Sequence, residues 1–150
     1  MKKIICIIPE HMFSKAEIKK LGTGFKTIYK NNYRPDKVGF FGMLMPEGYA
    51  YAERKPSEAV VVLVEVEEDI QRAKREELMH LFSDFLLKNF SISPLDAVIT
   101  VANASFVQQF SAAQQNRIHP KHRFWINLKT MATAMTSKIL NGYYRLRVKM

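Results

Sequence analysis

The sequence is poor in cysteine. Among its 150 residues the only one is Cys6, which stands in an apolar run, so no disulfide can form within the chain. This fits a reducing compartment. A chain of this length buries enough apolar surface to fold without disulfides or metal. We therefore expect a single domain with an ordinary core, and neither metal nor cofactor.

Long apolar runs are also missing. The run at the start, Ile4–Ile8, ends at Pro9 after five residues. A secretory signal needs an apolar stretch of roughly 7–15 residues, and a membrane span needs about 20. We expect a soluble, cytoplasmic protein without a membrane partner.

The last third of the chain lacks acidic residues. Asp96 is the last carboxylate side chain, and eight Lys or Arg residues follow it, so residues 97–150 carry +8 of the net charge of +9. Such a segment can bind an anionic partner, form a solvated face, or meet acidic residues elsewhere in the assembly. The sequence leaves these three readings open.

Several catalytic and nucleotide-binding motifs are absent. The chain has no G-x-x-x-x-G-K-[ST], G-x-G-x-x-G, G-x-S-x-G or H-E-x-x-H pattern. Nucleotide-binding, serine-hydrolase and zinc-protease functions therefore have no support from motifs.

The first third of the chain has a strand pattern followed by a helix pattern. Ile4–Ile8 is the β-branched run of a buried strand. Ser14 and Glu17 form an S-x-x-E capping box, which predicts that a helix begins there. Apolar residues then recur at helical spacing. Gly22 and Gly24 within this helix indicate where it lies close to a sheet.

The middle of the chain reads as strands. Lys37–Met45 is strand-like and is broken by Pro46-Glu47-Gly48. Tyr49–Lys55 is a short strand or an irregular crossing. Ala59–Val66 is the strongest strand pattern, because its near-continuous valines predict burial on both faces.

A second helix and strand complete a repeated β-α-β order. Glu67–Asp69 are expected at the helix start, where the helix dipole favours negative charge. The apolar stripe runs from Leu78 to Leu86, and Ala97–Val101 is the next strand. We predict an α+β fold of β-α-β-β-α-β order, with two helices on one face of a four-stranded mixed sheet. Its other apolar face needs a cover, for which subunit association is a natural answer.

The tail carries further helix and strand signals. Phe106–Gln115 can be helical, Arg117–Trp125 reads as a basic loop, and Leu128 to Ile139 has helical spacing with a stop at Asn141-Gly142. Alternation from Tyr144 to Lys149 predicts a final strand. We expect a core of residues 1–104 and a basic helical and strand extension of residues 105–150. This extension would pack on the core or on a neighbouring subunit.

The arrangement resembles the tautomerase superfamily, of the macrophage migration inhibitory factor and 5-carboxymethyl-2-hydroxymuconate isomerase type. The residues that carry the resemblance are Ile92-Ser93-Pro94 followed by Ala97–Thr100, Pro35, Ser57-Glu58, and Ile118-His119-Pro120 followed by Phe124. The resemblance implies a homotrimer whose sheet faces enclose a central barrel. It also implies keto–enol chemistry by an N-terminal proline that acts as a general base.

The start of this chain departs from that pattern. Its second residue is Lys2, and removal of an initiator methionine requires a small second side chain. Pro9 is internal, so its nitrogen is a non-basic amide. The candidate catalytic groups are therefore the α-amino group of Met1 and a desolvated Lys2. The alternative is that Lys2 and Lys3 are solvated charges at a chain end.

Tyr33, Arg34 and Lys37 lie where the family places a cationic substrate-binding group. An arginine there could clamp a carboxylate in a bidentate fork, so a small keto or enol acid is the candidate ligand. A solvated turn is the alternative. Glu67-Glu68 fall near the family's substrate-facing loop, where they would repel an acidic substrate.

The basic segment around His119 and His122 interleaves cations with Phe124 and Trp125. This pattern gives some support to nucleic-acid binding, but two histidines alone do not complete a metal site. The interpretation that we favour is a diverged tautomerase-fold protein without proline-based tautomerisation. The alternatives are an active isomerase that uses another base, and a binding or scaffold protein with a basic C-terminal face.

Overall fold

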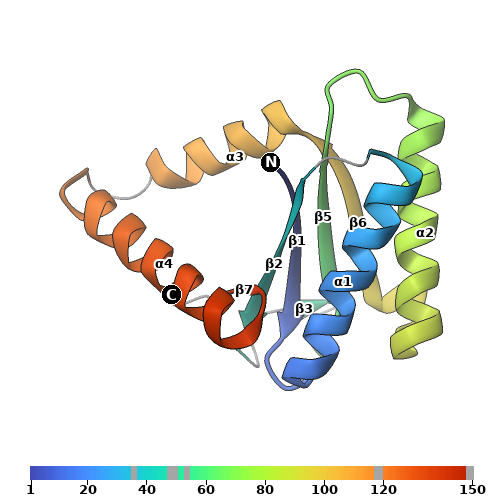
Figure 1. Ribbon diagram of the computed structural model, residues 1–150, viewed down its shortest axis with the longest axis horizontal. Helices are drawn as coiled ribbons and strands as arrows, with labels where there is room; N and C mark the ends of the chain where they lie inside the picture. The colour runs from blue at the N-terminus through green and yellow to red at the C-terminus, as the bar shows by residue number, and fades with distance from the viewer. Residues whose placement is uncertain (35–36, 47–50, 53–54, 117–119, 148–150) are drawn as a thin grey trace.

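A five-stranded mixed sheet organises the chain in the computed structural model (Figure 1). The structure describes residues 1–34, 37–46, 51–52, 55–116 and 120–147. The strands in sheet order are β6 (Ala97–Asn103), β5 (Val60–Val66), β1 (Lys2–Pro9), β2 (Val38–Met45) and β7 (Tyr144–Arg147). The helices are α1 (Lys15–Asn32), α2 (Arg72–Phe90), α3 (Ala104–Asn116) and α4 (Pro120–Asn141), with a 3₁₀ turn at Pro94–Asp96. A separate antiparallel pair joins β3 (Tyr51–Ala52) to β4 (Lys55–Pro56).

The strand directions follow from the two helical crossovers. The connection through α1 makes β1 and β2 parallel, and the connection through α2 makes β5 and β6 parallel. The two β-α-β units join where β1 and β5 pair in antiparallel register. The predicted four-stranded mixed sheet with two helices is confirmed, and β7 adds a fifth strand parallel to β2.

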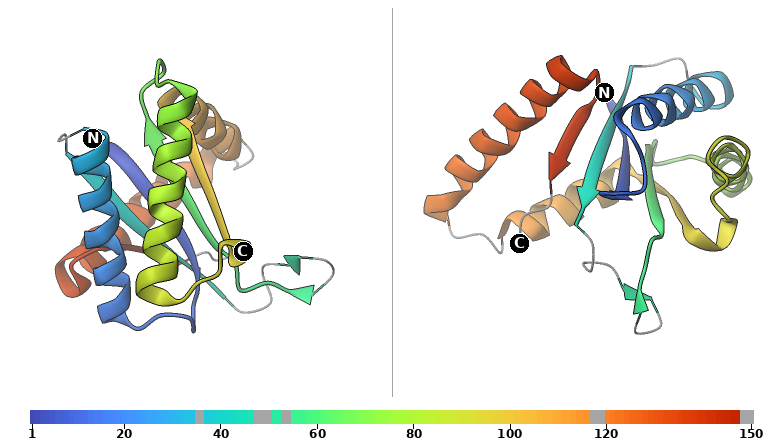
Figure 2. Two further views of the ribbon diagram at one scale, coloured as in Figure 1. Left: turned by 90° about the vertical axis from the view of Figure 1, so that its right-hand side faces the viewer. Right: turned by 90° about the horizontal axis from the view of Figure 1, so that it is seen from below.

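Both crossover helices cover the same face of the sheet (Figure 2). Side chains alternate between the faces of a strand, so Ile4, Cys6 and Ile8 point toward the helices and are fully buried. Phe25 of α1 lies between the sheet and α2, with its ring 4.7 Å from that of Phe82. This helix-covered face holds the core.

The other face of the sheet is apolar as well, as its valine pattern predicts. We call it the second sheet face. It carries alternate residues of the three central strands, and each of these is partly exposed: Ile5, Ile7, Phe41, Met43, Val61 and Leu63. Glu65 continues the β5 alternation at one end of this face. Helices α3 and α4 lie on this side of the sheet (Figure 2).

Helix α1 begins and packs as its sequence predicts. The Ser14 side chain accepts from the Glu17 amide, while the Glu17 carboxylate accepts from the Ser14 amide at 2.8 Å. A Cβ added to Gly22 would lie 2.5 Å from the ring of Phe40 in β2. The glycine therefore lets the helix approach the sheet, and Gly24 similarly admits the ring of Phe85 from α2.

The acidic triplet Glu67–Asp69 is not the start of the second helix, and this expectation was wrong. Helix α2 begins at Arg72 and has no acid in its first turn. Glu68 instead serves α3, because its carboxylate accepts from the Ser105 amide and the Ser105 hydroxyl, both at 2.8 Å. These hydrogen bonds, that of the Ser105 amide foremost, lower the pKa of Glu68 below its ordinary value of 4.5.

The tail agrees with the sequence pattern except at one point. Helix α3 includes the predicted helical segment, α4 ends before Gly142 and β7 follows. The predicted basic loop is wrong for Pro120 to Trp125, which form the first turns of α4, because proline is compatible with a first helical position. Some predicted features lie outside the described residues: the proline at 35, the break at 47–48, Arg117, His119 and the strand end at 148–149. Within the part of the chain that the structure describes, no helix has the length and apolarity to cross a bilayer.

Candidate functional site

The start of β1, the end of β5 and the last turn of α1 meet at one edge of the helix-covered layer. Because β1 and β5 are antiparallel, the first residues of β1 lie beside the last residues of β5. Helix α1 runs back along the sheet, so its last turn returns to the same place. Lys2, Tyr33, Arg34 and Glu67 are brought together there, and we call them the Glu67 cluster.

Lys2, the candidate base, is engaged in an ion pair. Its Nζ lies 3.1 Å from Oε2 of Glu67 and 3.4 Å from the carbonyl oxygen of Val66. Only 18% of its side chain is exposed. Met1 is different, because it is largely exposed and its side chain lies over Gly39 of β2, where an added Cβ would be 2.9 Å from the Met1 methyl group.

The predicted substrate-binding residues lie around the same carboxylate. The Tyr33 hydroxyl accepts a hydrogen bond of 2.9 Å from the Glu67 amide. Arg34 places Nη1 3.8 Å from Oε1 of Glu67, with about half of its side chain exposed. Lys37 is exposed and immediately precedes Val38, which is the register partner of Lys2. The fold therefore gathers Lys2, Tyr33 and Arg34, with Lys37 at the edge of the group.

Glu67 was expected near this region, but its pairing with Lys2 and Arg34 was not predicted. The expectation was that it would repel an acidic ligand from the region, whereas its two oxygens face Lys2 on one side and Arg34 on the other. The Glu67 carboxylate therefore lies between two cationic side chains.

Cys6 offers no alternative nucleophile. It lies on the helix-covered face of β1 and is fully buried. Burial raises the pKa of its thiol far above the ordinary value, so the reactive thiolate does not form at neutral pH.

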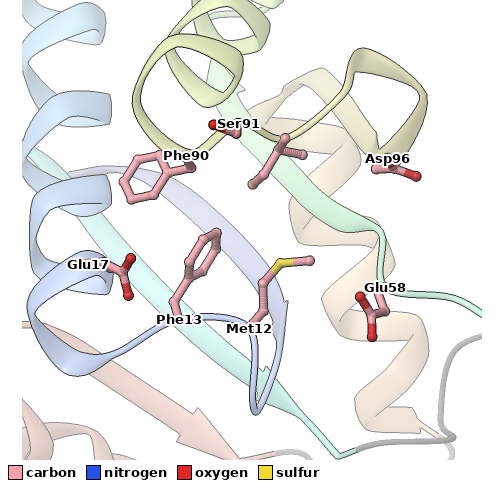
Figure 3. Close-up of a pocket in the computed structure, with 8 residues that line it drawn as sticks. Met12, Phe13, Glu17, Glu58, Phe90, Ser91 and Asp96 are labelled. Carbon is pink, nitrogen blue, oxygen red and sulfur yellow. The ribbon is translucent and has the colours of Figure 1, made fainter.

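A cavity of about 340 Å³ lies at the opposite end of β1 from the Glu67 cluster (Figure 3). It is lined by Met12, Phe13, Glu17, Glu58, Phe90, Ser91, Ile92 and Asp96. Two of its carboxylates already have partners, because Glu17 belongs to the capping box and Glu58 lies 3.1 Å from Nε2 of His11. Its lining comes from three separate parts of the chain, residues 12–17, 58 and 90–96, with no common motif, and for that reason the sequence did not predict it.

No metal site is evident among the described residues, where no three His, Cys, Asp or Glu side chains gather in a suitable cluster. His122 lies in the first turn of α4 and is exposed. Its neighbour in the predicted cluster, His119, is outside the described residues.

Comparisons with known proteins find likeness in structure only. No protein-family model and no curated protein matches the sequence. Among solved structures, native Ps01740 is 13% identical over 69% of this chain and 96% of its own, with a TM-score of 0.64. Pt0534 inactivated by 2-oxo-3-pentynoate is 12% identical over 67% of this chain and 84% of its own, with a TM-score of 0.62.

A fused 4-OT wild-type asymmetric trimer is 8% identical over 67% of this chain and 85% of its own, also with a TM-score of 0.62. These structures belong to the tautomerase superfamily. The chain has the tautomerase fold. Within that fold, β1 begins with Lys2 of the Glu67 cluster.

Proposed function

We propose that the protein is a diverged tautomerase-fold homotrimer in which proline-based keto–enol tautomerisation has been lost. The observation that carries this proposal is the contact between Lys2 and Glu67 at 3.1 Å. At this position a tautomerase would need an unprotonated secondary amine with an open approach for substrate. Lys2 is instead a primary amine that is largely buried and paired with a carboxylate.

The cationic groups of the site support the same proposal. Arg34 and Lys2 both face Glu67, so its carboxylate already offsets part of the positive charge that would hold an acidic substrate. A substrate carboxylate would have to displace Glu67 and leave that charge without its partners. Because these side chains are partly solvated, the pairing itself stabilises the fold by no more than about 1 kcal/mol. Its main effect is on ligand binding.

The direct test is an assay of phenylpyruvate and 2-hydroxymuconate tautomerisation with the purified chain. We expect rates at the level of the uncatalysed reaction. Turnover at ordinary enzyme rates that disappears when the amino terminus is chemically blocked would overturn the proposal, because it would show that an N-terminal amine still works as the base.

An active isomerase of a small keto or enol acid is the second candidate, and one observation favours it. Lys2 and Arg34 converge on a single carboxylate, so the cluster has the groups that would bind the carboxylate of a ligand. Pt0534, which shares the fold, is inactivated by a 2-oxo acid. If the protein is an active isomerase, the Glu67 side chain would move aside when a ligand carboxylate binds Lys2 and Arg34.

The substitution Glu67→Gln separates the two candidates. It keeps the shape of the side chain and removes its charge, so Lys2 and Arg34 become available to an anion. If Glu67 blocks the site, pyruvate should bind the variant at least ten-fold more tightly than the wild type, as measured by NMR titration. Glu77→Gln, on the outer surface of α2, is the matched control and should leave pyruvate binding unchanged. Tight binding of pyruvate to the wild type would favour the isomerase.

The homotrimer is part of this proposal. The apolar second sheet face supports it, as does the trimeric state of the fused 4-OT structures that share the fold. Sedimentation equilibrium should give three times the chain mass of 17.4 kDa. A single monomeric species at micromolar concentration would contradict it.

A further inference from the structure

Helices α3 and α4 form an arm that extends beyond the sheet (Figure 1). One side of α4 carries large apolar side chains at intervals of four, three, four and four residues, which places them on one face of a helix. We call this face the α4 stripe; its members are Phe124, Leu128, Met131, Met135 and Ile139. Each of them is between 46% and 83% exposed.

The chain's own contacts use the other side of α4. Ser137 is buried there, and its hydroxyl lies 2.9 Å from the carbonyl oxygen of Ala134 and 3.4 Å from that of Tyr143. At 100° per residue, Ala134 and Ser137 lie about 100° and about 160° from the centre of the α4 stripe. The helix therefore turns a polar side to its own chain and its apolar side to solvent, which reverses the usual arrangement of a surface helix.

Two exposed lysines border the α4 stripe, one on each side. Lys138 lies about 60° to one side of its centre and Lys129 about 120° to the other. The stem of a lysine packs along apolar surface while its ammonium group reaches a polar layer. The Lys138 ammonium donates to the Tyr144 hydroxyl at 2.8 Å, not to a carboxylate. Trp125, which is 67% exposed, lies at the edge of the stripe, and tryptophan favours the boundary between apolar and aqueous surroundings.

The sequence of the arm has no negative side chain to set against these cations. Every Asp and Glu of the chain lies at or before Asp96, and residues 97–150 contain eight Lys or Arg residues, four of them in α4. An anionic surface is therefore attracted to this segment. A continuous exposed apolar surface marks an interaction site, and the charge around it selects the kind of partner.

We propose that the α4 stripe lies on a membrane surface that contains anionic lipids. Its apolar side chains would enter the acyl region, with Lys129 and Lys138 at the phosphate headgroups. The expectation of no membrane partner rested on the lack of a signal segment and of a membrane span, and a helix that lies flat on a bilayer needs neither. This inference goes beyond the proposed function and does not depend on it.

A second copy of the chain fits the α4 stripe less well. In the proposed homotrimer the second sheet face encloses the centre and is not free for the α4 of a neighbour. The arm of another copy would bring the same positive charge. A single-stranded nucleic acid would satisfy the cations, but four of the five stripe members are not aromatic, and bases stack on aromatic rings. A lipid surface matches both the charge and the apolar area.

The first test is co-sedimentation of the full chain with vesicles. We expect at least ten-fold tighter binding to vesicles of phosphatidylcholine and phosphatidylserine in equal parts than to vesicles of phosphatidylcholine alone, and weaker binding as the salt concentration rises. Met131→Glu places a charge in the α4 stripe and should weaken binding at least ten-fold.

Thr133→Glu is the matched control for Met131→Glu. It makes the same change in net charge, but Thr133 lies about 160° from the centre of the stripe, with its hydroxyl bonded to the Lys129 carbonyl. Its binding should stay within about three-fold of the wild type. Circular dichroism checks that both variants are folded. Equal losses in the two variants, or equal binding to both kinds of vesicle, would overturn the inference.

The second test uses the wild-type chain and does not depend on a variant that folds. Trp125 is the only tryptophan of the chain, so its fluorescence reports on α4 directly. With phosphatidylserine-containing vesicles we expect its emission to move to shorter wavelength and to be quenched by lipids brominated in their acyl chains. An unchanged emission from vesicle-bound protein would show that another surface makes the contact.

Two further outcomes assign the α4 stripe to a different partner and overturn the inference. One is a wild type that ignores vesicles and forms an oligomer that Met131→Glu dissociates, which would make the stripe an interface between copies. The other is a chain that ignores vesicles and binds single-stranded RNA with a change in Trp125 emission. None of these results bears on the tautomerisation assay, so this inference and the proposed function fail separately.

Discussion

The core, from β1 to β6, and the arm of α3 and α4 use apolar residues in opposite ways. In the core they are enclosed between the sheet and two helices, as with Phe25, which is fully buried and contacts the rings of Phe40 and Phe82. In the arm, residues such as Met131 and Ile139 are mostly exposed. The core is thus stabilised by contacts within one chain, whereas much of the apolar surface of the arm stays exposed.

The sharpest test of this contrast compares truncations in the two regions. Phe25→Ala should lower the free energy of unfolding by about 3–5 kcal/mol, because it leaves a cavity at the centre of the core. Leu140→Ala, at a side chain of α4 that is 76% exposed, should change it by no more than about 0.5 kcal/mol. Urea denaturation measures both. Equal losses would mean that the arm packs within its own chain.

The close approach of α1 to the sheet gives the next largest effect. Gly22→Ala adds a methyl group 2.5 Å from the buried ring of Phe40, which has little room to move. We expect a loss of about 1–3 kcal/mol, larger than the gain of about 1 kcal/mol that alanine normally brings to a helix. Thermal unfolding measures the effect. A higher melting temperature for Gly22→Ala than for the wild type would mean that α1 shifts away from Phe40 and relieves the clash.

The capping box of α1 should contribute less to the free energy of unfolding than these packing contacts. Ser14→Ala removes the acceptor for the Glu17 amide and is expected to cost about 1 kcal/mol. Ser83→Ala in the middle of α2 is the control and should be neutral or slightly stabilising. Similar losses in both variants, measured by urea denaturation, would show that the cap is not the cause.

The junction between core and arm should show a small dependence on pH. The Ser105 hydrogen bonds lower the pKa of Glu68, so the stability they contribute is present above its ordinary value of 4.5 and is lost as pH falls through the lowered folded value. Glu68→Gln should remove this component. The difference in unfolding free energy between the wild type and the variant should therefore shrink below about pH 4.5, and a constant difference down to pH 2 would argue against the assignment.

Local signals made much of the fold predictable from the sequence. The capping box at Ser14, the valine strand Val60–Val66 and the helical spacing from Leu128 to Ile139 depend on neighbouring residues, and the structure agrees with each. The errors came where distant residues decide the outcome. Glu68 caps a helix 37 residues further along the chain, not the one that follows it directly.

The candidate site was predictable in its residues but not in its pairing. A resemblance in element order indicated Lys2, Tyr33 and Arg34, and the fold brings these three residues together around Glu67. Glu67 lies between the two cations because β1 pairs with β5 in antiparallel register. No pattern of neighbouring residues in the sequence predicts this pairing. The cavity beside Phe13 and Phe90 was missed for the same reason.

The pairing of β7 with β2 has a consequence for how the arm can move. The sheet order places β6 at one edge and β7 at the other, so α3 and α4 bridge the two edges and are fastened at each end. A segment tethered twice has already lost much of the conformational freedom of a free tail. In the proposed homotrimer, a neighbouring subunit that bound this segment would meet it in a restricted orientation, so little of the binding free energy would be consumed in ordering it.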